Sequence, residues 1–381
     1  MRTLDAAGLS IGDDHPPRIM GVLNVSKESP YDPSVYDDPG EAARYVDDEL
    51  IGEGADIVDV GLESANKRFE VLSAEEELER LDTAIETIES VSGDAVFSIE
   101  TRYHEVAEAA LNRGFDMVND ICGFADPEMP RVCEDHDVAV AKMASPPDLE
   151  RPGAVEEVDD IYEALARNGL TDKTIVDPAF GGWSEAKTLE DDRETFHRLR
   201  EFRGYGRPIL VSINRKNFLR SVAGRDTDGA LPVSLAATSM AVERGAHIVR
   251  THDVAETRDA ALIGKEFSRE RTRRDGDVSV EELDVTTTGE ARRHVDRLGG
   301  DPATAVDAVA RVYEFDGLDP EEIGALRAAV ADSAAHLVEG SAGDSALLVG
   351  TPGELATTAD AASGVTEALD AAVSPLAFPS E

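Results

Sequence analysis

Several side chains that can bind ligands or carry charge stand directly after short apolar runs of this chain. They are Asn24, Glu100, Asn119, Asp177, Lys216, Arg250 and His252. Carboxylates accept hydrogen bonds, amides both donate and accept them, and ammonium, guanidinium and imidazole groups donate them and can supply positive charge. Gathered in one place, such groups would form an active site. Whether they lie together depends on the elements that carry them.

Eight apolar runs in roughly the first 265 residues predict the strands that position these side chains. The runs occupy residues 19–23, 57–60, 96–99, 117–118, 138–141, 175–176, 209–213 and 248–249. Short runs that are rich in Val and Ile and apolar on both faces are typical of buried parallel strands. Helical patterns lie between them at 39–52, 73–90, 104–113, 155–168, 189–202 and 232–244. The second of these opens with the capping-box pair Ser73 and Glu76.

This alternation predicts an α/β fold, specifically a closed (β/α)8 TIM barrel. In such barrels the C-terminal ends of the strands carry the chemistry, which is where the candidate residues lie. A doubly wound open sheet is the alternative, and it usually has a glycine-rich phosphate-binding turn after its first strand. Residues 24–27 (NVSK) contain no glycine, which favours the barrel.

The composition is strongly acidic, with 79 acidic and 37 basic residues and a formal net charge of −42. Because 41% of the residues are hydrophobic, a full core can form, and we interpret the acid excess as a surface property. Such a surface suits a halophilic cytoplasm, where salt screens the repulsion between carboxylates; a cationic partner is the alternative. The absence of a basic stripe disfavours nucleic acid as a partner.

Cysteine usage and the N-terminal residues predict a cytoplasmic location. Cys122 and Cys133 have no CxxC spacing, so we expect a reducing compartment and no structural zinc. Residues 1–17 lack the basic and apolar regions of a signal peptide. No run approaches the ~20 apolar residues of a membrane span, so we expect a soluble protein that does not bind membranes.

The predicted organisation is an N-terminal tail at 1–17, a barrel at 18–267, a charged linker at 268–282 and a smaller, mainly helical C-terminal region at 283–381. In the last part, helical patterns cover 288–298, 302–314 and 320–339, and a strand is expected at 346–349. Asp301-Pro302 and Asp319-Pro320 are typical of helix N-termini. The residues of this region indicate no chemistry, and an accessory or dimerisation module is our hypothesis.

Seven ordered motifs resemble the dihydropteroate synthases and related pterin-binding enzymes. They are IMGVLNVS (19–26), EGADIVDVGLES (53–64), SIET (98–101), VNDI (118–121), DPAFG (177–181), NRKNFL (214–219) and VRTHDV (249–254). The resemblance implies a (β/α)8 transferase of folate biosynthesis. Such an enzyme condenses 6-hydroxymethyl-7,8-dihydropterin pyrophosphate with 4-aminobenzoate and releases pyrophosphate. Family members are commonly dimeric, so a homodimer is expected from the resemblance.

The resemblance also implies roles for the candidate residues. Glu100, Asn119, Asp177 and Lys216 would bind the edges of the pterin, and Arg250 and His252 would bind the pyrophosphate. Lys216, Arg250 and His252 would be the catalytic residues, acting by electrostatic stabilisation. Asn24 would hold the cofactor Mg²⁺, which prefers oxygen ligands and bridges the diphosphate.

The chain also departs from the family pattern. Glu100 replaces an aspartate. The loops at 26–34 and 64–68 are altered, and in the family these loops form the arylamine pocket. Lys67 or Arg68 would take the place of the family's arginine in the second loop. The segment 181–187 replaces a Gly-Phe-Gly-Lys motif. These changes leave two alternatives open: a pterin-binding methyltransferase or a synthase with another nucleophile, and a non-catalytic pterin-binding paralogue.

Overall fold

The computed structural model describes residues 3–25, 34–63, 71–149, 153, 155–181, 187–269, 271–275, 278–283 and 285–377. The chain divides into two compact units, Met1–Glu270 and Arg271–Glu381. The predicted boundaries at 17/18, 267/268 and 282/283 are finer than this division and stay predictions.

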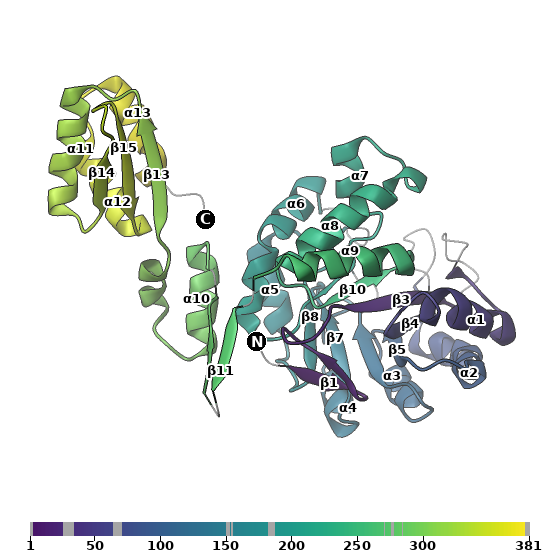
Figure 1. The fold of residues 1–381 in the computed structure, drawn as a ribbon. Coiled ribbons are helices and arrows are strands. Elements are labelled where there is room, and N and C mark those ends of the chain that lie inside the picture. The colour runs from purple at the N-terminus through teal and green to yellow at the C-terminus, as the bar shows by residue number, and fades with distance from the viewer. Residues whose placement is uncertain are drawn as a thin grey trace. The chain divides into compact units, whose positions relative to one another are not determined.

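The first unit is built on eight parallel strands, all at the predicted places (Figure 1). They are β3 (Arg18–Asn24), β4 (Ile57–Gly61), β5 (Val96–Thr101), β6 (Met117–Asp120), β7 (Ala139–Met143), β8 (Thr174–Asp177), β9 (Leu210–Val211) and β10 (Ile248–Thr251). Their order is β8-β7-β6-β5-β4-β3-β10-β9. A parallel bridge between Val176 and Ile209 joins the two outer strands and closes the barrel. The (β/α)8 fold is thus confirmed.

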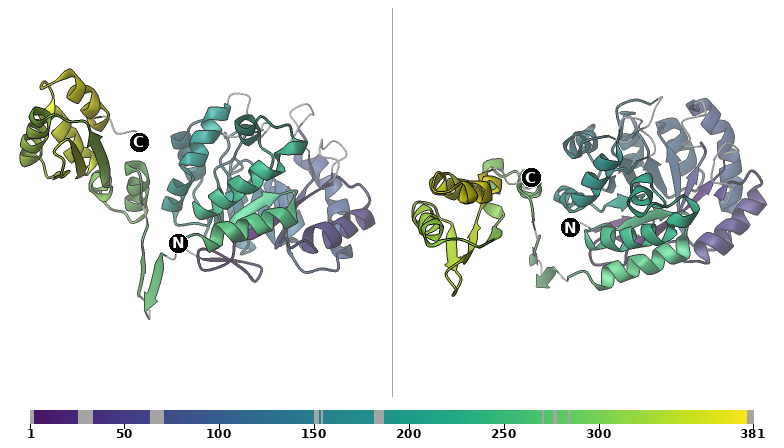
Figure 2. Two further views of the ribbon diagram at one scale, coloured as in Figure 1. Left: turned by 45° about the horizontal axis from the view of Figure 1, so that its top comes forward. Right: turned by 90° about the horizontal axis from the view of Figure 1, so that it is seen from above.

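Helices follow the strands and surround them in both views of Figure 2. The helices of the first unit are α1 (Pro39–Tyr45), the π-helix η2 (Val46–Ile51), α2 (Ala74–Ser90), α3 (His104–Leu111), α4 (Met129–Asp135), α5 (Val158–Ala166), α6 (Leu189–His197), η3 (Leu199–Tyr205), α7 (Asn217–Ala223), η4 (Asp228–Ala230), α8 (Leu231–Glu243) and α9 (Val254–Glu266). The capping box of Ser73 and Glu76 begins α2 as predicted. Among the described residues, no helix is long and apolar enough to cross a membrane.

The inside of the barrel is apolar at one end and polar at the other. At the N-terminal ends of the strands, Met20, Ile57 and Met117 pack with residues of a hairpin formed by β1 (Leu4–Ala6) and β2 (Leu9–Ile11). The N-terminal residues, predicted only as a tail, therefore cover this end of the barrel. The opposite end is left for the polar residues that follow the strands.

The second unit is a separate α/β structure. It contains a hairpin of β11 (Thr272–Asp275) and β12 (Val278–Glu281), then α10 (Thr288–Arg297), η5 (Pro302–Ala308), β13 (Arg311–Asp316), α11 (Pro320–Asp332), β14 (His336–Glu339), β15 (Ser345–Gly350), α12 (Pro352–Ala362) and α13 (Glu367–Ala377). The last three strands form an antiparallel sheet in the order β13-β15-β14.

Two helical predictions in this unit were too long. The pattern at 302–314 ends at Ala308 and gives way to β13, and the pattern at 320–339 ends at Asp332 and gives way to β14. Val312, Tyr313 and Phe315 belong to the β-branched and aromatic types that favour strands, and sheet pairing with β15 outweighs the helical spacing. The strand at 346–349 and the aspartate caps of η5 and α11 are confirmed.

Candidate active site

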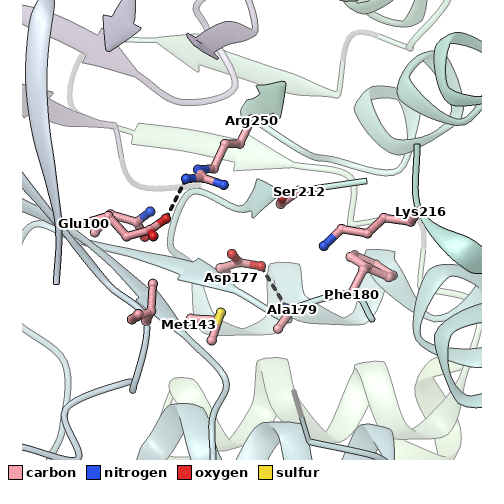
Figure 3. A pocket seen from close by; sticks show the side chains of 10 residues that line it. Glu100, Met143, Asp177, Ala179, Phe180, Ser212, Lys216 and Arg250 are labelled. Atoms are coloured by element: carbon pink, nitrogen blue, oxygen red, sulfur yellow. Dashed lines mark hydrogen bonds and ion pairs between the residues drawn. The ribbon is translucent and has the colours of Figure 1, made fainter. Parts of the chain in front are cut away.

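A pocket of about 360 Å³ lies at the C-terminal ends of the barrel strands (Figure 3). It is lined by Glu100, Asn119, Ile121, Met143, Asp177, Ala179, Phe180, Ser212, Lys216 and Arg250. Five of the seven residues predicted from the sequence thus share one cavity, although they come from five different strands or strand-end loops.

A buried ion-pair network forms one side of the pocket. Arg250 donates from Nε to Asp59 Oδ2 at 2.8 Å and from Nη2 to Glu100 Oε2 at 2.5 Å. Asn119 Nδ2 donates to the same Asp59 oxygen at 2.8 Å, which fixes the amide, and no described residue donates to its Oδ1. Asp59 was not among the predicted site residues. Its signal was a lone acid within the apolar run of β4, where an unpaired carboxylate would be costly to bury.

Glu100, which by the resemblance stands in place of an aspartate, forms an ion pair with Arg250. The side chain is one methylene longer than aspartate, and it reaches the guanidinium of Arg250 directly. Burial raises the pKa of Glu100, and the charge of Arg250 opposes that rise. Two other buried cations have different partners: Arg102 pairs with Glu63, and Lys142 donates to backbone carbonyls.

Asp177 is held in a tight turn at the end of β8. Its Oδ1 accepts a hydrogen bond from the Ala179 amide at 2.8 Å, and no described residue donates to Oδ2. Burial raises the pKa of Asp177 to about 6, against the lowering effects of the Ala179 amide and of Lys216 and Arg250. The carboxylate is therefore ionised at neutral pH with one oxygen available to a ligand.

Lys216 enters the pocket from the residue that precedes α7. Burial lowers its pKa, as does the nearby Arg250, whereas Asp177 and Asp192 act in the opposite direction. Figure 3 shows its ammonium end turned toward Asp177 and Ser212. The pocket is thus lined by two carboxylates, an amide, an ammonium and a guanidinium.

Two predicted residues, Asn24 and His252, are not among the pocket-lining residues. Asn24 Nδ2 donates to Ser34 Oγ at 3.1 Å, while its Oδ1 lies next to Gly61. Burial, together with the charge of Arg250, lowers the pKa of His252 to about 3. His252 is consequently neutral at pH 7, and its role toward the pyrophosphate stays a prediction.

Other expectations are settled only in part. The predicted loop residues Lys67 and Arg68 and most of the altered loop 26–34 lie outside the described residues. Among the described residues, one further group could hold a metal ion, namely His104, Glu105 and Asp126. Asp126 already accepts hydrogen bonds from the His104 ring and from two backbone amides, so this cluster is accounted for by local folding.

The sequence matches one family of known proteins over most of the barrel. The family model for pterin binding enzymes matches residues 20–252. A probable bifunctional folylpolyglutamate synthase/dihydropteroate synthase of Halobacterium salinarum is 32% identical over 259 residues, which cover 65% of this chain and 31% of that protein. The chain therefore spans about a third of the length of that relative.

Shorter relatives are matched over most of their length. A dihydropteroate synthase of Bacillus subtilis is 31% identical over 244 residues, covering 62% of this chain and 84% of that protein. A solved structure of a dihydropteroate synthase from Thermus thermophilus, in complex with 4-aminobenzoate, is 30% identical to this chain and has a TM-score of 0.56. The match covers 70% of this chain and 100% of that chain. Since the family match extends over more than half of the chain and contains the whole pocket, this chain belongs to the pterin binding enzymes.

Proposed function

We propose that the chain is a dihydropteroate synthase that joins 6-hydroxymethyl-7,8-dihydropterin pyrophosphate to 4-aminobenzoate in folate biosynthesis. The observation that carries this proposal is the single pocket in which Asp177, Asn119, Lys216 and Arg250 converge. The relatives from Bacillus subtilis and Thermus thermophilus, which bear the name of this activity, support it.

In the proposed reaction the amine nitrogen of 4-aminobenzoate attacks the pterin methylene carbon. The bond from that carbon to the pyrophosphate oxygen breaks, pyrophosphate leaves with the electron pair, and the amine releases one proton to solvent. Asp177 Oδ2 and Asn119 Oδ1 accept hydrogen bonds from the pterin N–H groups, and Lys216 donates to a ring acceptor. Asp177 and Asn119 are held before the reaction by their hydrogen bonds to the Ala179 amide and to Asp59.

Charge stabilisation is the main contribution of the protein. The guanidinium of Arg250 is fixed by Asp59 and Glu100 through Nε and Nη2, and no described residue accepts from Nη1. A cation fixed in this way stabilises negative charge on departing pyrophosphate without having to reorganise. The neutral ring of His252 would add a hydrogen bond to the same anion.

Mg²⁺ is the proposed cofactor, with Asn24 as its protein ligand. The amide nitrogen of Asn24 is engaged by Ser34, and no described residue donates to Oδ1, so a hard oxygen ligand is available at the end of β3. Mg²⁺ prefers oxygen ligands and usually binds through one or two protein groups plus phosphates. When bound, it would neutralise charge on the diphosphate. A cytoplasmic, halophilic homodimer is part of the same proposal.

The test is pyrophosphate release from 6-hydroxymethyl-7,8-dihydropterin pyrophosphate in molar KCl with Mg²⁺, with and without 4-aminobenzoate. We expect release that depends on the aminobenzoate and that is largely lost in Lys216→Ala. Lys173→Ala is a matched control, because Lys173 precedes β8 at the far end of the strand that carries Asp177. Equal turnover of Lys216→Ala and the wild type would contradict the proposal.

A synthase with another nucleophile is the second candidate, because the altered loops at 26–34 and 64–68 correspond to the family's arylamine pocket. Such a synthase would bind the pterin pyrophosphate but would release no pyrophosphate when 4-aminobenzoate is the only nucleophile supplied. A methyltransferase is disfavoured, since methyl transfer has no anionic leaving group to require Lys216 and Arg250 in the pocket.

A further inference from the structure

The turn from Asp177 to Gly181 forms one wall of the pocket and has an unusual backbone. Ala179 and Gly181 have φ angles of 58° and 54°, in the left-handed region. Ala179 is not a glycine, so it reaches this conformation only because surrounding contacts hold it there. Phe180, between them, stacks on Phe218 at 5.7 Å and points into the pocket wall.

Two buried charged residues, Lys187 and Asp192, hold this turn. Lys187 Nζ donates to Ala179 O at 3.1 Å, and Asp192 Oδ1 accepts from Gly181 N at 2.9 Å. The two side chains are also an ion pair, with Nζ and Oδ1 3.6 Å apart and exposures of 0% and 3%. Neither residue is among those that line the pocket. They therefore contact the wall without contacting the cavity.

The fit around the turn is close. A Cβ added to Gly181 would lie 3.0 Å from Asp192 Oδ2 and 3.9 Å from Lys216 Cδ. Asp192 is thus packed against the backbone that separates it from Lys216. Burying two charges costs free energy that a close pair with good hydrogen bonds only partly offsets, so stability alone is a weak reason for this arrangement.

We propose that Lys187 and Asp192 are positioning residues that fix the Asp177–Gly181 turn and thereby hold the Asp177 carboxylate and the adjacent Lys216 in their binding geometry. The proposal rests on the proposed function only for the identity of the ligand. Lys187 acts through the Ala179 carbonyl, and Asp192 acts through the Gly181 amide. Asp177, in turn, accepts a hydrogen bond from the Ala179 amide through Oδ1, and its Oδ2 would accept from the pterin.

The charge of Lys187 also acts on Asp177. Among the described residues, the positive charges of Lys216, Arg250 and Lys187 each favour the ionised form of Asp177. Removing the charge of Lys187 should raise the pKa of Asp177 and shift the acid limb of the pH profile of kcat/KM to higher pH. A role confined to stability would leave that limb in place.

The experiment uses the full chain and compares Lys187→Met with the wild type, with Lys187→Arg as the rescue variant. Lys173→Met is the matched control. Lys173 directly precedes β8, the strand that ends at Asp177, and its Nζ pairs with the exposed Asp137 at 3.0 Å. For Lys187→Met we expect a KM for the pterin pyrophosphate raised on the order of 10- to 100-fold, because a displacement of about 1 Å can cost 10²-fold. The kcat should change less, and Lys187→Arg should restore both KM and the acid limb.

Amide hydrogen exchange of the free protein supplies a readout that needs no ligand. The peptide containing Ala179 and Gly181 should exchange faster in Lys187→Met and not in Lys173→Met. If Lys187→Met does not fold, Lys187→Met/Asp192→Leu replaces the pair with apolar groups and leaves no unpaired charge.

Unchanged KM, acid limb and amide exchange in a folded variant would overturn the inference. Faster exchange with a raised KM supports it. If the wild type neither binds nor turns over the pterin pyrophosphate, the proposed function fails. In that case the exchange result alone decides whether Lys187 and Asp192 hold the turn.

Discussion

Replacing Arg250 with methionine should destabilise the barrel strongly, because its guanidinium neutralises two buried carboxylates. Asp59 is 0% exposed and Glu100 9% exposed, and both bond directly to Arg250. Without the guanidinium, Asp59 keeps a single neutral donor, the amide of Asn119, and its Oδ1 has no hydrogen-bond partner among the described residues even now.

Removing one partner of a buried ion pair typically costs about 3–5 kcal/mol, because the remaining charge is left uncompensated. A domain's whole stability is roughly 5–15 kcal/mol, so Arg250→Met should lose a large part of it. Neutralising one carboxylate as well, in Glu100→Gln/Arg250→Met, should recover part of the loss. The double variant is therefore expected to be more stable than Arg250→Met.

The assay is urea unfolding followed by circular dichroism in constant molar KCl. Arg113→Met is the matched control, because Arg113 pairs with Asp82 on the surface, with exposures of 42% and 73%. Exposed pairs of this kind contribute about 0–1 kcal/mol. A loss in Arg250→Met no greater than in Arg113→Met, or a double variant less stable than Arg250→Met, would refute the reasoning.

Three further predictions concern the site and its support. Lys216→Ala should lower kcat by about 10²–10³-fold in a folded enzyme, measured as pyrophosphate release, since it removes a preorganised donor; a loss under 10-fold would count against that role. The kcat/KM for the pterin pyrophosphate should fall as the pH drops through about 6, because Asp177, with its raised pKa, becomes protonated there; a flat profile from pH 8 to 5 would contradict the ionised carboxylate. Burial lowers the pKa of Lys142 to about 7 from its ordinary value of 10.5. Between pH 7 and 10.5 the Lys142 amine is therefore protonated in the unfolded chain and neutral in the folded one, so the free energy of unfolding should rise with pH. Lys142→Met should remove that contribution to the slope of unfolding free energy against pH, and an identical slope would show that Lys142 is not the group responsible.

The sequence predicted best those features that follow from the geometry of parallel strands. Parallel strands of a barrel end on the same face, so polar residues after apolar runs had to converge, and Glu100, Asn119, Asp177, Lys216 and Arg250 do. Strand geometry does not predict the role of a polar residue inside a strand, nor which residues far apart in the sequence form ion pairs. The role of Asp59 depends on a guanidinium that is 191 positions away in the chain.

Other features depend on tertiary packing that local patterns do not encode. The burial of Leu4 and Ile11 against the barrel comes from a hairpin whose short strands carry little periodicity. In the second unit, β13 follows η5 where helical spacing continued, because pairing with β15 decided the outcome. The neutrality of His252 likewise depends on burial beside Arg250, which residue spacing does not reveal.

The most direct test of the central claim is the identity of the product. The full chain is incubated with 6-hydroxymethyl-7,8-dihydropterin pyrophosphate, 4-aminobenzoate and Mg²⁺ in molar KCl, and the mixture is analysed by mass spectrometry. The account predicts dihydropteroate in amounts equal to the pyrophosphate released, and neither product without the aminobenzoate. Pterin pyrophosphate that binds but yields no dihydropteroate would contradict it.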